Sequence, residues 1–141
     1  MTDQTADSLL ILPSRDVILE AHRASVTHFG GADGVRNEGG FDSALARPLN
    51  IIAYEGDSAS VYRLAAAVGA GISQNHPFVD GNKRTAILAS IVTLWVNGYV
   101  LDVSEREMTD KVLALASNKL TEDELCAWLE ANSIEREGRL A

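Results

Sequence analysis

The chain has 141 residues, 46% of them hydrophobic and 23% charged, and carries a formal net charge of −8 at pH 7. This length predicts one domain with a substantial hydrophobic core. The acidic balance argues against general nucleic-acid binding, because that function needs a broad basic surface to neutralise phosphates.

The start of the chain and its apolar runs also limit the class of protein. Residues 1–8 are polar and acidic, unlike a signal peptide, and the apolar run 86–96 is too short to span a bilayer. The single Cys126 excludes an internal disulfide. We therefore expect a cytoplasmic protein that contacts no membrane and no nucleic acid directly.

Helical patterns dominate the first half of the chain. Ser14 can cap a helix that runs to about Phe29, and 41–46 resembles a short helix that ends before Pro48. The apolar stretch 49–54 tolerates a strand and is followed by a turn signal at 55–58. A small hairpin and an irregular segment both remain open there.

Four further helices are expected in the second half. Ser58 or Ser60 can cap a helix to about residue 75, whose small residues and two glycines indicate close packing against another backbone. The stretch 85–96 is apolar on every side, as in a buried central helix. Capping boxes at 104–107 and 121–124 open two more helices, to about residues 116 and 132.

The most informative segment joins two of these helices. It reads His76-Pro77-Phe78-Val79-Asp80-Gly81-Asn82-Lys83-Arg84 and leads directly into the apolar helix. A helix N-terminus offers unpaired N–H groups and a partial positive charge, and a glycine lets a ligand approach closely. Two cations in the first turn add full charges, so the segment predicts a phosphate-binding site.

Each side chain of the segment has a functional and a structural interpretation. His76 is the candidate general base, or else a core histidine. Asp80 could bind Mg²⁺ or cap the helix. Gly81 and Asn82 could contact phosphate oxygens or form a turn, and Lys83 and Arg84 could neutralise a phosphoryl group or face solvent. Because all of them precede one buried helix, we favour the functional interpretation. The catalytic set is His76, Asp80, Asn82, Lys83 and Arg84; the nucleotide-binding set is Gly81, Asn82, Lys83 and Arg84; and Asp80 is the metal ligand.

The segment resembles the signature of the Fic/Doc (Fido) superfamily, and Lys83 points to its Doc, or death-on-curing, branch. Family members that transfer AMP usually carry Gly-Asn-Gly-Arg and a second arginine three residues later. Here Lys83 replaces that glycine, and Ile87 occupies the position of the second arginine. Segments at 29–31, 34–39 and 43–48 also look like the N-terminal half of Doc proteins.

The resemblance implies an all-α bundle of about six helices with a buried central helix and a short β-hairpin flap, expected at 48–57. It implies a toxin of a type II toxin–antitoxin system that transfers the γ-phosphoryl group of ATP, with Mg²⁺, to a Ser or Thr hydroxyl. The implied target is translation elongation factor Tu, and the implied partner is a cognate antitoxin. AMP transfer and a non-catalytic nucleotide- or partner-binding domain remain alternatives.

The remaining signals are weaker. We expect a polar tail at 1–8, the domain at 9–132 and a charged tail at 133–141. In that tail Ser133, Glu137 and Gly138 match the inhibitory motif of self-inhibited Fic proteins, with chance as the favoured explanation. His22 and His28 lie on different helix faces, so a metal pair is not expected. Arg36, Glu38 and Arg47 could line the rim of the site or pair on the surface, and we favour the surface.

Overall fold

The computed structural model describes residues 10–136, which are mostly helical. The helices are α2 (Arg15–Phe29), α3 (Glu38–Glu55), α4 (Val61–Asn75), α5 (Asn82–Val96), α6 (Glu105–Ala116) and α7 (Glu122–Asn132), with a 3-10 turn at Gly56–Ser58. The strands are β1 (Tyr99–Leu101) and β2 (Ser133–Glu135). The prediction of an all-α bundle is confirmed.

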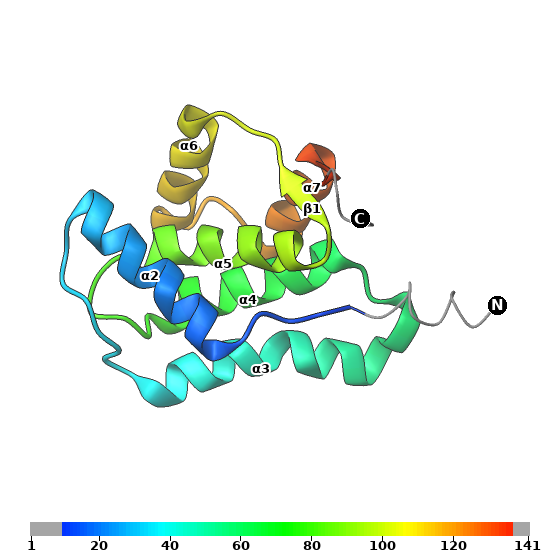
Figure 1. The fold of residues 1–141 in the computed structure, drawn as a ribbon, viewed down its shortest axis with the longest axis horizontal. Helices are drawn as coiled ribbons and strands as arrows, with labels where there is room; N and C mark the ends of the chain where they lie inside the picture. The colour runs from blue at the N-terminus through cyan, green and yellow to red at the C-terminus, as the bar shows by residue number, and fades with distance from the viewer. Residues whose placement is uncertain (1–9, 137–141) are drawn as a thin grey trace.

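Helices α4 and α5 form the centre of the bundle (Figure 1). Helix α4 packs against α3, α5 and α7, while α2 and α6 pack against α5. Every residue of α4 from Leu64 to Ser73 is buried, whereas α5 exposes part of Trp95 near its end. The predicted buried centre is therefore shared by two helices, and α4 is the more deeply buried of them.

Local capping explains where most helices begin. The Ser14 hydroxyl accepts a hydrogen bond from the N–H of Val17, and the Ser60 hydroxyl accepts one from Arg63. Thr121 and Glu124 form a complete capping box, in which each side chain accepts from the other residue's backbone N–H. These helix starts agree with the starts predicted from the sequence, because a cap depends only on residues within one turn.

The two glycines of α4 allow neighbouring helices to approach it closely. A Cβ atom at Gly69 would lie 2.4 Å from Ser90 Oγ and 3.0 Å from the carbonyl oxygen of Ala86, both on α5. A Cβ atom at Gly71 would lie 3.0 Å from Ala44 Cα on α3. The close packing expected from the small residues of this helix is confirmed.

The hairpin flap predicted at 48–57 is absent, and the helix predicted to end before Pro48 continues. Helix α3 runs through Pro48 to Glu55, and the 3-10 turn follows at once. Pro48 lacks the N–H that would bond to the carbonyl of Ala44, which costs helix stability. Pro48 and Ala44 are both buried, so packing of α3 against α4 offsets that cost.

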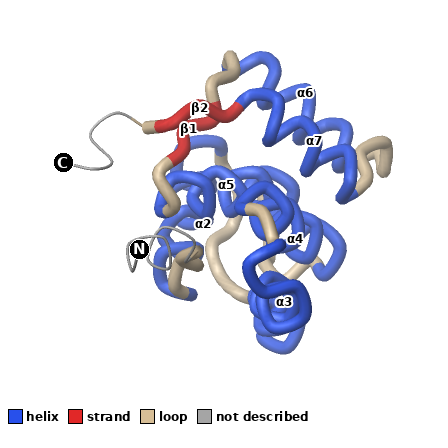
Figure 2. The backbone as a smooth tube through the Cα atoms, turned by 90° about the vertical axis from the view of Figure 1, so that its right-hand side faces the viewer, coloured by secondary structure: helices blue, strands red, loops and turns tan. Residues whose placement is uncertain are grey.

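A two-stranded antiparallel sheet joins the end of α5 to the residues after α7 (Figure 2). Val100 pairs with Ile134, and the Arg136 guanidinium lies 4.2 Å from the centre of the Trp95 ring. Residues 133–135, placed by the sequence in a charged tail, thus form a strand. Glu137 and Gly138, with the tail at 1–8, lie outside the described residues.

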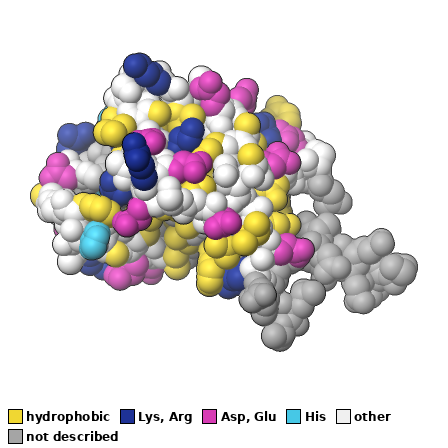
Figure 3. Space-filling model, turned by 90° about the horizontal axis from the view of Figure 1, so that it is seen from above, with side chains coloured by type: hydrophobic (Ala, Val, Ile, Leu, Met, Phe, Trp, Pro, Cys, Tyr) yellow, Lys and Arg dark blue, Asp and Glu magenta, His cyan; other side chains and the backbone are white. Residues whose placement is uncertain are grey.

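The described surface mixes charges of both signs. On the face in Figure 3, Lys and Arg side chains lie singly among acidic and apolar ones and form no broad basic area. Within residues 10–136, the helices are all too short or too polar to cross a membrane.

Candidate active site

The segment predicted to bind phosphate is the loop between the two central helices. His76 ends α4 in the left-handed conformation, with φ 48°, and its N–H donates to the carbonyl of Ile72. Gly81 begins α5 with φ 76°, a conformation that glycine adopts without steric cost. Among residues 10–136, no side chain caps this helix start. Its first N–H groups are therefore available to an anion.

Asn82 closes the loop on itself. Its Oδ1 accepts a hydrogen bond from the N–H of Phe78 at 2.9 Å, and its Nδ2 donates to the carbonyl of Phe78 at 3.0 Å. The Phe78 ring is fully buried and anchors the loop in the core. The turn-forming interpretation of Asn82 thus describes its side chain here, and the amide is not free for a phosphate.

His76 is exposed and suited to accept a proton. Partial burial lowers its pKa below the ordinary value of 6.5, and the positive charges of Lys83 and Arg36 lower it further. The imidazole is therefore neutral at neutral pH, which is the form that a general base needs. The core-histidine interpretation does not apply, because the side chain lies at the surface.

Asp80 is exposed and does not cap α5. Its Oδ2 accepts a hydrogen bond from the N–H of Ala32 at 2.8 Å, while Oδ1 makes no hydrogen bond within residues 10–136. In the same range, no three His, Cys, Asp or Glu side chains gather in a way that could enclose a metal. One available carboxylate fits Mg²⁺, which proteins often bind through one or two carboxylates together with substrate phosphates and water.

The two cations of the loop differ in their surroundings. Lys83 Nζ donates to the carbonyl oxygen of Ser73 at 2.6 Å and to its hydroxyl at 2.9 Å, so it is engaged at the end of α4. Burial lowers the pKa of Lys83. The Arg84 guanidinium lies 3.8 Å from the centre of the Phe29 ring and makes no hydrogen bond or ion pair among the described residues. Arg84 is therefore the cation whose donors are available.

The segment before α3 contacts the loop along its length, and the sequence did not reveal this. The carbonyl of Pro77 accepts hydrogen bonds from the N–H groups of Arg36 and Asn37, and Val79 N–H donates to Gly34. Arg36 Nη2 also donates to the carbonyl of His76 at 3.3 Å. This segment, 30–37, lies against the motif, whereas residues 48–57, where the flap was expected, form the end of α3 and the start of the 3-10 turn.

The three residues expected on the surface have different environments. Glu38 is exposed and pairs with Arg15. Arg36 is exposed at the rim of the loop. Arg47 is half-buried and bridges helices, because it donates to the carbonyl of Ala67 on α4 and pairs with Glu122 of α7 at 2.6 Å. The surface expectation is therefore wrong for Arg47, which holds three helices together.

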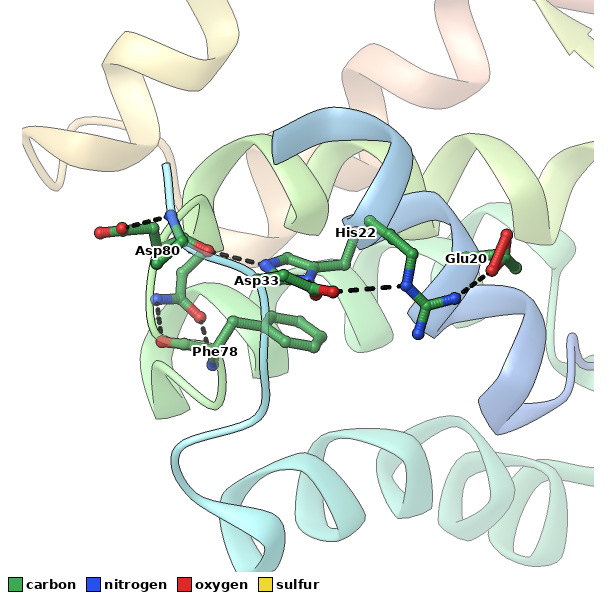
Figure 4. A network of polar contacts seen from close by, with 8 residues as sticks. Glu20, His22, Asp33, Phe78 and Asp80 are labelled. Atoms are coloured by element: carbon green, nitrogen blue, oxygen red, sulfur yellow. Dashed lines mark hydrogen bonds and ion pairs between the residues drawn. The ribbon is translucent and has the colours of Figure 1, made fainter. Parts of the chain in front are cut away.

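His22 is the residue of this region that sequence reasoning missed. It lies in the middle of α2 with only 1% of its surface exposed, and its Nε2 is 2.8 Å from the carbonyl oxygen of Asp80 (Figure 4). His28 is exposed on another face, as expected. A signal did exist: His22 falls on the apolar face that carries Ile18 and Val26, where a polar group needs a partner.

The structure thus brings together a neutral imidazole, a carboxylate and an uncapped helix start with Arg84 beside it. Such a set can bind an anionic phosphate and remove a proton from a hydroxyl next to it. Asn82 and Lys83 support the loop in this structure, so their predicted contacts with phosphate remain predictions.

Comparison with known proteins gives two kinds of match. The model of the Fic/DOC family matches residues 12–94. "Toxin Doc" of Mycolicibacterium smegmatis is 40% identical over 73 residues, which cover 52% of this chain and 56% of that protein. "Protein kinase doc" of Escherichia phage P1 is 25% identical over 108 residues, which cover 77% of this chain and 84% of that protein.

Proposed function

Because the chain belongs to the Fic/DOC family, on its Doc branch, we propose that it is a Doc-like toxin that phosphorylates a protein. In this proposal it transfers the γ-phosphoryl group of ATP to a Ser or Thr hydroxyl. The names of the two relatives, a toxin and a protein kinase, support both halves of the proposal. The match to the toxin spans little more than half of that protein.

The phosphates of ATP would bind at the start of α5. The N–H groups after Gly81 are uncapped there, and Arg84 has uncommitted donors. Asp80 would hold Mg²⁺, which when bound neutralises charge on the phosphate oxygens. Lys83 adds positive charge from its place on Ser73. These groups would stabilise the charge that phosphoryl transfer spreads over the γ-phosphate.

His76 would accept the proton of the attacking hydroxyl. The hydroxyl oxygen forms a bond to the γ-phosphorus, the bond from that phosphorus to the bridging oxygen breaks, and ADP leaves. The proton moves to the imidazole of His76, which is neutral at neutral pH because its pKa is lowered. A positioned base of this kind contributes about 10²–10⁴-fold to the rate.

The observation that favours phosphoryl over AMP transfer is the burial of Ile87. This residue occupies the position of the second arginine of AMP-transferring relatives, and its side chain is fully buried in the core. No cation can therefore reach the phosphates from the second turn of α5. An enzyme that lacks this contact has less means to hold the terminal phosphates in the pose for AMP transfer.

The biological partners follow from the same proposal. The target would be translation elongation factor Tu in the cytoplasm, so that modification arrests translation. A cognate antitoxin would block the toxin.

Asn82 and Lys83 would act mainly by holding the loop, and each side chain would contact phosphate directly only after a change of rotamer.

A mass measurement tests the reaction. After incubation of the protein with Mg²⁺, ATP and elongation factor Tu, we expect a phosphate increment on the factor. An AMP increment would replace the proposed reaction with the second one, and no increment would favour a binding module or another target. His76→Ala should abolish the increment, and a wild-type rate in that variant would refute the role of the base.

A growth assay tests the biological role. Expression of the wild-type chain in a bacterium should arrest growth, and expression of His76→Ala at the same level should not. Co-expression of the neighbouring gene, if it encodes the antitoxin, should restore growth. Harmless accumulation of folded wild-type protein would count against a toxin.

A further inference from the structure

His22 contacts the loop before α5 through both its ring face and a ring nitrogen. Its ring stacks on the fully buried ring of Phe78, with centroids 4.0 Å apart and planes 11° apart. Figure 4 shows the ring between α2 and the loop that leads into α5. The stack fixes the plane of the imidazole, so the direction of each ring nitrogen is fixed as well.

One of these nitrogens holds the backbone of the candidate active site. Nε2 lies 2.8 Å from the carbonyl oxygen of Asp80, and because a carbonyl only accepts, Nε2 carries the hydrogen. That carbonyl belongs to the peptide between Asp80 and Gly81. Rotation of this peptide would redirect the Gly81 N–H and change the relation between Asp80, on one side of the peptide, and the start of α5 on the other.

Side chains of α2 also fill the space beside that peptide. A Cβ atom at Gly81 would lie 3.3 Å from Val26 Cγ1 and 3.9 Å from His22 Nε2. The peptide therefore has little freedom on the side of α2. His22 supplies the polar contact at this surface, and Val26 supplies the apolar one.

The other side of the ring faces the segment that holds the Asp80 carboxylate. Nδ1 lies 3.4 Å from Asp33 Oδ1, and Asp33 Oδ2 accepts a hydrogen bond from Arg23 Nε at 3.3 Å. The neighbouring Ala32 donates its N–H to Asp80 Oδ2. Asp80 is thus held at two points, through its carbonyl by α2 and through its carboxylate by residues 30–37.

We infer that His22 is a positioning residue for the phosphoryl transfer, which holds the Asp80–Gly81 peptide so that the Asp80 carboxylate and the start of α5 keep one fixed relation. This inference rests on the proposed function. His22 cannot itself be a second base, because it is buried and its Nε2 is already bonded. Its part is to prevent rotation of the peptide.

Two substitutions separate the hydrogen bond from the packing. His22→Phe keeps an aromatic ring against Phe78 but has no donor, and His22→Gln keeps a donor near the position of Nε2. We expect kcat to fall about 10- to 100-fold in His22→Phe with the KM for the protein target unchanged, because misplacement of about 1 Å has effects of this size. His22→Gln should recover most of the loss.

A measurement without turnover accompanies the kinetics. In the ¹H–¹⁵N NMR spectrum of the free protein, the amide signals of Gly81 and Asn82 should shift in His22→Phe and return toward wild type in His22→Gln. Binding of Mg²⁺ with a non-hydrolysable ATP analogue, measured by calorimetry, should weaken in the same order. His22→Met serves as the second donor-free variant if the larger phenylalanine prevents folding.

Leu129→Ala is the matched control for stability, since Leu129 is fully buried in α7, away from the loop. It should destabilise the protein and leave kcat and the amide signals of Gly81 and Asn82 unchanged. Unchanged kcat in folded His22→Phe and His22→Met, or unshifted loop signals, would overturn the inference. Absence of phosphoryl transfer by the wild-type protein would overturn the proposed function instead, and the amide signals and calorimetry would then decide the role of His22.

Discussion

The ammonium group of Lys83 lies 2.6 Å from the backbone carbonyl oxygen of Ser73, which joins the first turn of α5 to the last turn of α4. The candidate active-site loop begins and ends at these two helices. Ser73 also accepts through its hydroxyl at 2.9 Å, so the lysine fixes the distance between the ends of the loop. In this structure Lys83 therefore supports the site rather than pointing into it.

Loss of this lysine should reduce stability as well as activity. Lys83→Met keeps most of the aliphatic stem but leaves the carbonyl of the buried Ser73 without its donor. We expect the free energy of unfolding in urea to fall by about 1–2 kcal/mol with an unchanged m-value. Lys119→Met, which alters an exposed lysine after α6, is the control and should unfold as the wild type does. Equal stability of both variants would show that the contact with Ser73 contributes nothing.

Replacement of glycine by alanine should have opposite effects on the free energy of unfolding at Gly69 and at Gly39. At Gly69 a Cβ atom would lie 2.4 Å from Ser90 Oγ and 3.0 Å from a backbone oxygen of α5. Gly69→Ala should therefore lower the free energy of unfolding by about 1–3 kcal/mol, because the two central helices must move apart. At Gly39, in the first turn of α3, the nearest atom would lie at an ordinary 3.7 Å.

Gly39→Ala should accordingly raise the free energy of unfolding by about 0.4–1 kcal/mol, since alanine reduces the freedom of the unfolded chain. Urea unfolding of the two variants side by side checks both signs. Tolerance of Gly69→Ala would contradict the close approach of α4 and α5, and destabilisation by Gly39→Ala would contradict the open space at the start of α3.

Much of the fold was predictable because its signals are local. Ser14 and Thr121 lie within one turn of the groups that they cap, and the nine-residue motif contains its own loop, glycine and helix start. Pro48 misled the prediction because its local cost is real, whereas the burial that offsets it comes from a distant helix. The pairing of Val100 with Ile134 joins residues that carry no mutual signal in one sequence.

In the candidate site, too, local features were predictable from the sequence and contacts with distant residues were not. The sequence predicted a site at His76, Asp80, Gly81 and Arg84, which the structure places at the two ends of one short loop. It could not identify the contacts of Asp80 with His22 and with Ala32, because those residues precede Asp80 by 58 and 48 positions. The side chains of Asn82 and Lys83 also turn to partners outside the anion site, a choice that depends on the packed loop.

The charge of Arg36 should affect the pH dependence of the reaction, because it lowers the pKa of His76. Burial and the charges of Lys83 and Arg36 lower the pKa of His76 below its ordinary value of 6.5. Because a base must be unprotonated to act, the rate should fall only when the pH drops below that ordinary value. Arg36→Gln keeps a polar side chain but removes the charge. The pKa of His76 should rise, and the acid limb of kcat/KM should move to higher pH.

Arg36→Lys, which keeps the positive charge, should retain an acid limb close to that of the wild type. Arg106→Gln removes a charge of the same sign at an exposed position of α6, outside the loop, and should leave the limb in place. If the acid limb moved equally in Arg36→Gln and Arg106→Gln, the shift would reflect net charge alone. That result would contradict a local effect of Arg36 on the pKa of His76.

The stacking of Arg84 on Phe29 should contribute to binding of ATP. The guanidinium lies 3.8 Å from the ring centre, and Phe29 is about half exposed at the end of α2. An exposed cation–π contact contributes about 0.5–1 kcal/mol, which corresponds to a change of about two- to fivefold in affinity. Phe29→Leu removes the ring but keeps an apolar side chain. We therefore expect the KM for ATP to rise by about that factor, with kcat nearly unchanged, because the contact orients Arg84 without touching the reacting atoms.

Steady-state kinetics at varied ATP concentration tests this expectation against two controls. Phe29→Tyr retains an aromatic face and should keep the wild-type KM, while Arg84→Ala should raise KM and lower kcat together, since it removes charge from the transferring group. Tyr54→Leu makes a comparable aromatic-to-aliphatic change at a residue that is 94% exposed on α3 and should alter neither constant. If Phe29→Leu lowered kcat as strongly as Arg84→Ala, the ring would do more than orient the guanidinium. If it changed neither constant, Arg84 would bind phosphate without help from α2.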